Sequence, residues 1–229
     1  MFIDDYPLNL AQRSPWPCRR GGWMCWISLT LVWLLPPSVA AQPALQFAPQ
    51  TVEVSGLTPG GEAVLFGVVR QSVPWMERVV PYVMWLSAED PDGTASFSAV
   101  DELGPKSVWA VVDLTSMASR VDGPNVDAFA VGPLAGADTF SSASSELHLS
   151  GSRLQVLVTR AGQGAWSGVV VDGAASDLDG LDNGAVSLSI SDLQPVAASG
   201  KPPESLQPGD VVVAVDTATL KISSETIAE

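Results

Sequence analysis

The chain has 229 residues, 25 acidic against 11 basic side chains, and a formal net charge of −14. This charge argues against nucleic-acid binding, because phosphates would be repelled and the Lys and Arg residues are scattered singly. It also disfavours anionic membrane surfaces and favours solubility, divalent cations or basic partners. One histidine and two cysteines leave too few ligands for an ordinary zinc site.

The first 41 residues have the pattern of an export signal. A basic pair, Arg19 and Arg20, precedes an apolar run at residues 23–35 and then small residues up to Ala41. The run is shorter than the roughly 20 residues that span a bilayer. We therefore expect a Sec signal peptide at residues 1–41, cleaved near Ala41, and a secreted or periplasmic protein with no stable membrane anchor. Twin-arginine export and an uncleaved anchor are the alternatives.

Cleavage at this point would change the composition of the exported protein. Cys18 and Cys25 both lie in the leader, so the exported chain would have no disulfide, although its compartment permits one. It would keep 8 basic and 23 acidic residues, a net charge of about −15. Its stability would then have to come from its hydrophobic core alone.

Short runs of β-branched and aromatic residues between turn-forming clusters predict an all-β protein. We expect a first β-sandwich domain at residues 42–134 with about six strands. Its Glu62–Arg70 run is apolar on both faces and predicts a central strand. Pro81 cannot donate a ladder hydrogen bond, so Arg78–Ala88 is predicted at an edge or a bulge. The other predicted strands are Thr51–Ser55, Thr94–Ser98 and Ser107–Leu114.

Small polar residues at 135–146 predict a linker to a second β-sandwich domain at residues 147–229. The fold class is therefore two small antiparallel β-sandwiches, immunoglobulin-like or jelly-roll-like, although one continuous sandwich remains an alternative. No clear internal repeat is seen. Strands are predicted at Arg153–Arg160, Trp166–Val171, Ala185–Leu193, Asp210–Asp216 and Leu220–Ser223.

An acidic stretch between two predicted strands is the candidate metal site. Its oxygen ligands would be Asp172, Asp177, Asp179, Asp182 and Asn183. Calcium prefers six to eight such hard oxygens, so we expect calcium as the cofactor if one is bound. The spacing does not fit an EF-hand, and the alternative is an exposed hairpin connection built from Asx-turns.

A local resemblance covers residues 163–190. Gly164-Ala165-Trp166, Val169, Val171, Asp172-Gly173-Ala174-Ala175 and Asp177 precede a hydrophobic strand that ends at Ile190. This stretch resembles part of the P-domain, a β-sandwich module of secreted subtilisin-like proteases. The resemblance implies a jelly-roll-like accessory domain without the protease, because no catalytic residues accompany it.

Catalytic motifs are weak in this sequence. His148 is the one histidine available for a Ser-His-Asp triad, and no G-x-S-x-G motif accompanies it. Among the aromatic residues, Trp109 and Trp166 are expected in the core. Trp75 follows Val73-Pro74 in a loop-like stretch and is the candidate for an exposed binding surface.

These observations favour a non-catalytic binding or structural protein, with an unknown protein or glycan as partner. A carbohydrate-binding or adhesion module is the first alternative. A hydrolase that uses paired carboxylates is the second.

Overall fold

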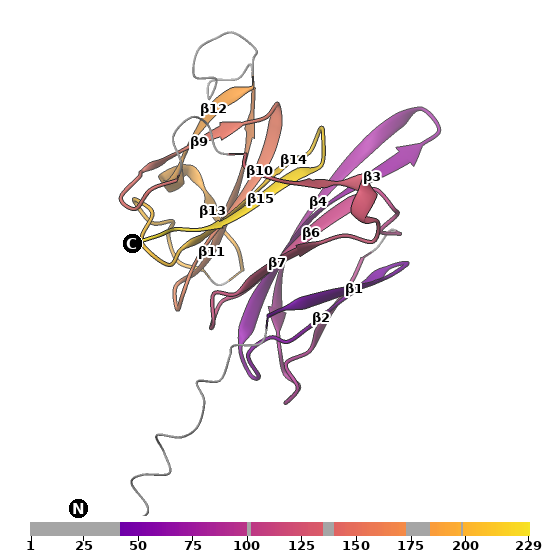
Figure 1. Ribbon diagram of the computed structural model, residues 1–229, viewed down its shortest axis with the longest axis horizontal. Coiled ribbons are helices and arrows are strands. Elements are labelled where there is room, and N and C mark those ends of the chain that lie inside the picture. Colours follow the sequence, from indigo (N-terminus) through magenta and orange to yellow (C-terminus); the bar gives the residue numbers. More distant parts are fainter. Residues whose placement is uncertain (1–41, 100–101, 135–139, 173–183, 198) are drawn as a thin grey trace, which may run out of the picture. The chain divides into compact units, whose positions relative to one another are not determined.

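The regular secondary structure of the described residues is nearly all β-strand, and nearly all strand pairs are antiparallel, which confirms the predicted all-β sandwich class. The computed structural model describes residues 42–99, 102–134, 140–172, 184–197 and 199–229 (Figure 1). Two short 3-10 helices, η2 (Val126–Ala128) and η3 (Ile190–Asp192), are the helical elements of this described part. The export signal predicted at residues 1–41 lies outside it.

The first half of the chain forms a seven-stranded sandwich. One sheet has the order β1-β2-β5, and the facing sheet has the order β4-β3-β6-β7. Seven strands divided between two facing sheets is also the strand count of an immunoglobulin constant-type sandwich. The bounds are β1 Ala44–Ala48, β2 Thr51–Ser55, β3 Glu62–Val73, β4 Met76–Ser87, β5 Ala95–Ser98, β6 Ser107–Asp113 and β7 Ser119–Asp122.

The second half forms another sandwich, with a large sheet of order β13-β11-β10-β14-β15-β8 and a small sheet β12-β9. The pairing of β8 with β15 is parallel, and the others are antiparallel. The bounds are β8 Ala130–Val131, β9 Glu146–Ser150, β10 Arg153–Arg160, β11 Gly164–Val171, β12 Ala185–Ser189, β13 Gln194–Pro195, β14 Val211–Asp216 and β15 Lys221–Thr226.

The two sandwiches repeat one strand pattern. In the first, β3 pairs with β4 and β6, β6 pairs with β7, and β2 pairs with β5 in the other layer. In the second, β10 pairs with β11 and β14, β14 pairs with β15, and β9 pairs with β12. The chain therefore contains an internal repeat at the level of topology, which the sequence did not reveal.

The turns that follow β6 and β14 repeat in atomic detail. The N–H of Met117 donates to the carbonyl of Asp113, and the N–H of Leu220 donates to the carbonyl of Asp216, both at 2.8 Å. Met117 and Leu220 both have a φ of 57°. Each aspartate Oδ1 also accepts the N–H two residues further on, at 2.9 Å from Thr115 and at 3.1 Å from Ala218. Matching turns at matching places extend the repeat from topology to local geometry.

Three hydrophobic cores alternate with the sheets. Leu65, Trp109 and Val111 belong to the core between the two sheets of the first sandwich. There the ring of Trp109 stacks on Tyr82, with centroids 5.4 Å apart, and a Cβ on Gly67 would lie 2.2 Å from the Trp109 ring. Any larger residue at position 67 would therefore displace the indole. A second core lies inside the other sandwich and includes Leu154, Val156, Val158, Trp166 and Val212.

The central core joins the two sandwiches. It contains Phe66 and its neighbours from β3 and β6, together with Val213 and its neighbours from β10, β14 and β15. Strands β6 and β14 are buried along their whole length as a result. Residues 63–69 of β3 are also buried, and β3 lies between β4 and β6, which confirms the central strand predicted at Glu62–Arg70. Pro81 lies in β4, at the edge of its sheet, also as predicted.

The segment predicted as a linker is partly packed on the second sandwich. Residues 135–139 lie outside the described residues, but Phe140 packs against the second core. The N–H of Ala143 donates to the carbonyl of Leu206 at 2.9 Å, and the N–H of Leu206 donates to the carbonyl of Ser144 at 2.8 Å. Strand β8, before the predicted boundary, joins the large sheet of the second sandwich. The described residues belong to one compact unit.

A buried ion pair fixes the loop that leads into β14. Arg160, at the end of β10, donates from Nε to Asp210 Oδ1 at 2.8 Å and from Nη2 to Asp210 Oδ2 at 2.7 Å. Its Nη2 also donates to the carbonyl of Ser205, and the Gln207 N–H donates to Asp210 Oδ2, both at 2.8 Å. Asp210 is only 1% exposed, so the ion pair is buried.

Replacing Arg160 with Met should therefore lower the free energy of unfolding by about 3–5 kcal/mol, because the Asp210 carboxylate would stay buried without its counter-ion. Arg153→Met, in the exposed first residue of the same strand, is the matched control and should cost less than about 0.5 kcal/mol. Urea unfolding of both variants measures the difference. Equal stabilities would show that the ion pair contributes nothing.

Candidate functional site

The β3–β4 hairpin extends beyond the rest of its sheet. Strand β6 accompanies β3 only as far as the Val69–Ser107 pair, whereas β3 and β4 remain paired to Val73 and Met76 (Figure 1). In the repeated sandwich the equivalent hairpin, β10–β11, ends at the Arg160–Gly164 pair, the counterpart of Val69 and Val80. Residues 70–79 are therefore an addition to the shared pattern, which we call the hairpin extension.

Polar contacts hold the hairpin extension against the rest of the protein. Arg70 donates from Nη1 to the carbonyl of Ala218, in the β14–β15 turn, at 2.9 Å. Its Nη2 forms an ion pair with Glu77 across the hairpin. Lys106 Nζ lies 3.5 Å from the other oxygen of Glu77. These contacts tie both strands of the extension to the loop before β6 and to the second sandwich.

We call the contacts of Arg70 with Glu77 and Ala218, and of Lys106 with Glu77, the brace. Its positive charges favour the ionised form of Glu77. The hydrogen bond and the charge of Arg70 lower the pKa of the Glu77 carboxyl below its usual range, and Lys106 acts in the same direction. Glu77 is exposed, so solvent screens the pair and its contribution to stability is small. The brace therefore orients the hairpin more than it stabilises the fold.

The tip of the hairpin extension carries Trp75, the most exposed large apolar side chain of the described residues. Pro74 and Trp75 form the two-residue turn, and the exposed fractions are 88% for Trp75 and 61% for Met76. Trp75 is therefore exposed, as predicted, and its role as a contact residue is a proposal taken up below. Trp109 and Trp166 are buried, as predicted, with exposed fractions of 0% and 2%.

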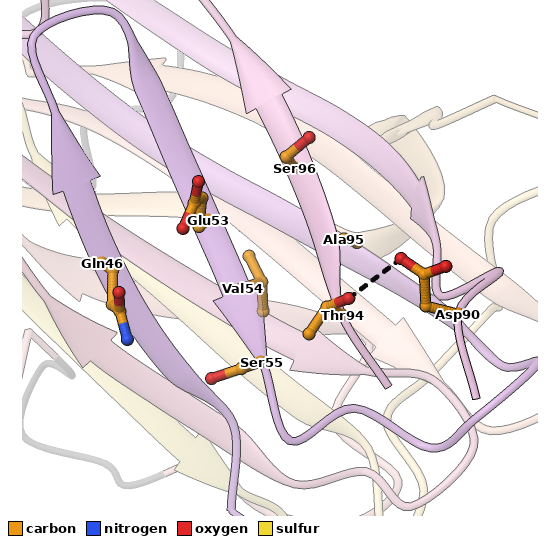
Figure 2. A pocket seen from close by; sticks show the side chains of 8 residues that line it. All are labelled: Gln46, Glu53, Val54, Ser55, Asp90, Thr94, Ala95 and Ser96. Atoms are coloured by element: carbon orange, nitrogen blue, oxygen red, sulfur yellow. Dashed lines mark hydrogen bonds between the residues drawn. The ribbon is translucent and has the colours of Figure 1, made fainter. Parts of the chain in front are cut away.

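A groove of about 360 Å³ crosses the sheet β1-β2-β5 (Figure 2). Gln46, Glu53 and Ser96 lie opposite one another on the three strands and contribute to its lining. Asp90 also lines the groove, and its Oδ2 lies 3.1 Å from the hydroxyl of Thr94, as Figure 2 shows. Glu53 and Asp90 are both exposed, so the groove offers two carboxylates in a solvated setting.

The candidate calcium site lies mostly outside the described residues. Asp177, Asp179, Asp182 and Asn183 fall in the segment 173–183, and Asp172 is the one candidate ligand with a described position. Asp172 Oδ2 accepts the N–H of Gly184 at 2.8 Å. Within the part of the chain that the structure describes, no three His, Asp or Glu side chains converge as a metal site would require.

The alternative interpretation of this acidic stretch as a hairpin connection was wrong. Strand β11 belongs to the large sheet and β12 to the small sheet of the second sandwich, so the two strands are not paired with each other. The acidic stretch connects two layers. Asp172 and Gly184 close this connection at its two ends through their hydrogen bond.

His148 lies in β9, where its Nε2 is 3.9 Å from a carboxylate oxygen of Glu146. The imidazole is partly exposed, while the neighbouring Leu147 and Leu149 are buried. His148 therefore occupies the outward-facing position of an alternating strand. Because Glu146 lies two residues away on the same strand, the contact is local and does not assemble a catalytic group.

The sequence did not single out Asp113, which organises two turns. Its Oδ2 accepts the N–H and the hydroxyl of Thr58 at 2.8 and 2.7 Å, and its Oδ1 accepts the N–H of Thr115 at 2.9 Å and of Ser116 at 3.3 Å. Burial raises the pKa of Asp113, but these hydrogen bonds outweigh burial and lower it overall. The only sequence signal was Asp113 with Thr115 and Ser116 two and three residues further on, a spacing typical of an Asx-turn.

No protein-family model matches this chain, and no curated protein matches it. The part of the chain that the structure describes contains no helix with the length and apolarity needed to cross a membrane.

Asp113→Asn should lower the free energy of unfolding by about 1–3 kcal/mol at pH 7, because a buried carboxylate that accepts several hydrogen bonds is lost. The pKa of Asp113 is lower in the folded state than in the unfolded state. Its contribution to stability is therefore complete above the unfolded-state pKa of about 3.9, and it is lost as the pH falls through the folded-state pKa. Urea unfolding from pH 7 to pH 3 should show the gap between variant and parent closing below about pH 4.

Asp127→Asn, at an exposed position, serves as the control and should follow the parent protein at every pH. A gap for Asp113→Asn that stays constant down to pH 3 would contradict this account of the hydrogen-bonded carboxylate.

Proposed function

We propose that this protein is an exported, non-catalytic binding protein that attaches to a partner protein through the tip of the hairpin extension. The observation that carries the proposal is Trp75, 88% exposed on an extension that the repeated sandwich lacks. An indole exposed to this degree contributes little to folding. Tryptophan is, however, among the residues most often responsible for binding energy at protein interfaces.

The brace around Arg70 supports this proposal. Arg70, Glu77 and Lys106 hold the two strands of the extension together, and Arg70 also reaches the carbonyl of Ala218. A side chain presented on a fixed hairpin loses less conformational entropy on binding than one on a loose loop. Trp75 is thus positioned as an anchor that would enter an apolar pocket of the partner, with Met76 beside it.

The local charge supports selectivity toward the partner. Arg70, Arg78 and Lys106 lie at the base of the tip with Glu77 between them, in a chain whose net charge is −14. An acidic rim around the partner's pocket would be attracted to this point and repelled elsewhere. A glycan stacked on Trp75 is the alternative partner.

For the alternative of a hydrolase with paired carboxylates, Glu53 and Asp90 in the sheet groove are a candidate pair. Both are solvated, and the Thr94 hydroxyl lies at hydrogen-bond distance from Asp90. General acid catalysis needs one carboxyl whose surroundings keep it protonated, and burial is the usual means. The hairpin is therefore the better-supported site.

Export is a further part of the proposal, and so is calcium binding, whose test is given at the end of this subsection. The leader pattern at residues 1–41 supports a secreted or periplasmic location with a mature start near Gln42. The resemblance of residues 163–190 to the P-domain supports an accessory role outside the cell.

Placing the photo-reactive benzoylphenylalanine at position 76, beside an intact Trp75, should yield one discrete covalent adduct in the host's envelope or medium. The same group at position 126, where Val126 is also exposed, is the control and should not yield it. Excess parent protein should suppress the adduct, whereas excess Trp75→Ala protein should not, because truncation of an anchor costs about 2 kcal/mol or more of binding energy. Equal competition by both proteins would contradict the proposal.

Calcium should raise the melting temperature of the exported protein by several degrees at millimolar concentration, because a ligand that binds only the folded state stabilises it. The comparison is thermal unfolding with calcium and with chelator, and Asp172→Asn should reduce the shift. No shift with the parent protein would remove calcium from the proposal.

A further inference from the structure

A second candidate binding site lies where the two sandwiches meet. A cleft of about 450 Å³ opens there, lined on one side by Gly60, Gly61, Glu62, Trp85, Leu114 and Thr115 and on the other by Gly162, Gln163, Gly164 and Ser199. Its volume is within the range of small-molecule sites, roughly 300–1,000 Å³. Trp75 is not among the lining residues, so this cleft is separate from the hairpin tip.

The wall from the first sandwich is fixed by Asp113. This buried carboxylate accepts hydrogen bonds from Thr58, which precedes Gly60 and Gly61, and from the N–H of Thr115. The N–H of Gly61 donates back to the carbonyl of Thr58 at 2.8 Å, and its own carbonyl accepts the N–H of Ala88 at 3.0 Å. One buried charge therefore organises both turns that line this side.

The wall from the second sandwich is also held by buried polar contacts. Arg160, paired with Asp210, immediately precedes the turn that contains Gly162 and Gln163. Ser199 Oγ donates to the carbonyl of Val196 at 2.7 Å and accepts the N–H of Ala165, next to Gly164, at 2.9 Å. These hydrogen bonds fix the conformation of both walls in the free protein. Binding a ligand would therefore cost little conformational entropy.

Glycines keep the space between the walls open. A Cβ at Gly60 or at Gly162 would meet no atom within 4 Å. Both residues have left-handed backbone conformations, with φ of 70° and 67°, that glycine adopts most easily. The indole of Trp85, packed in part against the central core, is only half-buried beside this space.

The chemistry of the lining favours an uncharged, hydroxyl-rich ring. Among the lining residues there is neither Lys nor Arg to hold an anion, and Glu62 is the single charged group. A carboxylate accepts hydrogen bonds from hydroxyls, and the amide of Gln163 both donates and accepts. An indole offers an apolar face on which the C–H face of a sugar ring packs. We propose that this cleft binds a neutral saccharide, with Trp85 as its stacking platform.

The test is fluorine NMR of the exported protein labelled with 5-fluorotryptophan, titrated with maltose, cellobiose, lactose, mannobiose and diacetylchitobiose. Trp85→Phe assigns the Trp85 resonance. At least one disaccharide should shift that resonance saturably and leave the Trp75 resonance unchanged. If none shifts it, the proposal is overturned. A shift with tetramethylammonium alone would also overturn it, in favour of a cationic ligand.

Because Trp85 packs on the core, a second variant keeps the test independent of folding. Gly162→Asn retains a residue that tolerates the left-handed conformation and places a side chain in the cleft. It should weaken saccharide binding by roughly tenfold or more. Gly104→Asn, at another open glycine with a φ of 61°, is the matched control and should bind as the parent does. Equal binding by both variants would place the saccharide elsewhere.

Failure of this test would leave the proposed function intact, because Trp75→Ala alters the hairpin and leaves the cleft unchanged. Conversely, a Trp75→Ala protein that loses its partner should still bind the saccharide.

Discussion

The packing of the two large sheets against each other is the constraint on which the rest of this structure depends. Each sheet would otherwise expose a continuous apolar face, for example Phe66 with its neighbours on one side and Val213 with its neighbours on the other. Burial of such side chains contributes roughly 1.5–3 kcal/mol each. We expect the chain to have no disulfide after export. It therefore obtains its rigidity from the central core, which neither sandwich forms alone.

Both candidate sites lie at the margins of this central core. The cleft is bounded by turns from each sandwich, and its Trp85 packs partly on the core itself. The hairpin extension belongs to the first sandwich, but Arg70 attaches it to Ala218 of the second. The relative position of the sandwiches thus sets the shape of the cleft and the orientation of the tip. The repeat also shows which features are additions, since the shorter β10–β11 hairpin gives the unextended form.

Much of the fold was predictable because local patterns report local burial. The apolar run at Glu62–Arg70 predicted a central strand, and Pro81 predicted an edge or a bulge; in the structure β3 is central and β4, which contains Pro81, lies at the edge. The strand predicted at Ala185–Leu193 is shorter in the structure, because β12 ends at Ser189 and η3 follows it. What covers a face cannot be read from the strand itself, so the central core was not predictable. The repeat escaped notice because its clearest likeness is confined to the turns after Asp113 and Asp216.

The candidate sites were also predictable only in part, again because sequence patterns report local features. The exposure of Trp75 followed from the preceding proline and a loop-like sequence. The brace around Glu77 did not, because Lys106 is distant in sequence and meets it only in the folded sheet. Trp85 lies in an apolar strand, and that strand alone did not show whether the indole would be exposed. Its partial exposure depends on glycine turns from both halves of the chain.

The most direct test of the shared core is urea unfolding followed separately in each sandwich. In two variants of residues 42–229, all tryptophans but one are replaced with Phe, leaving either Trp109 in the first sandwich or Trp166 in the second. If the central core couples the sandwiches, backbone circular dichroism and indole fluorescence should give one coincident transition within each variant. A fluorescence transition clearly separated from the loss of the remaining β-structure would show that the sandwiches unfold independently and would contradict the account.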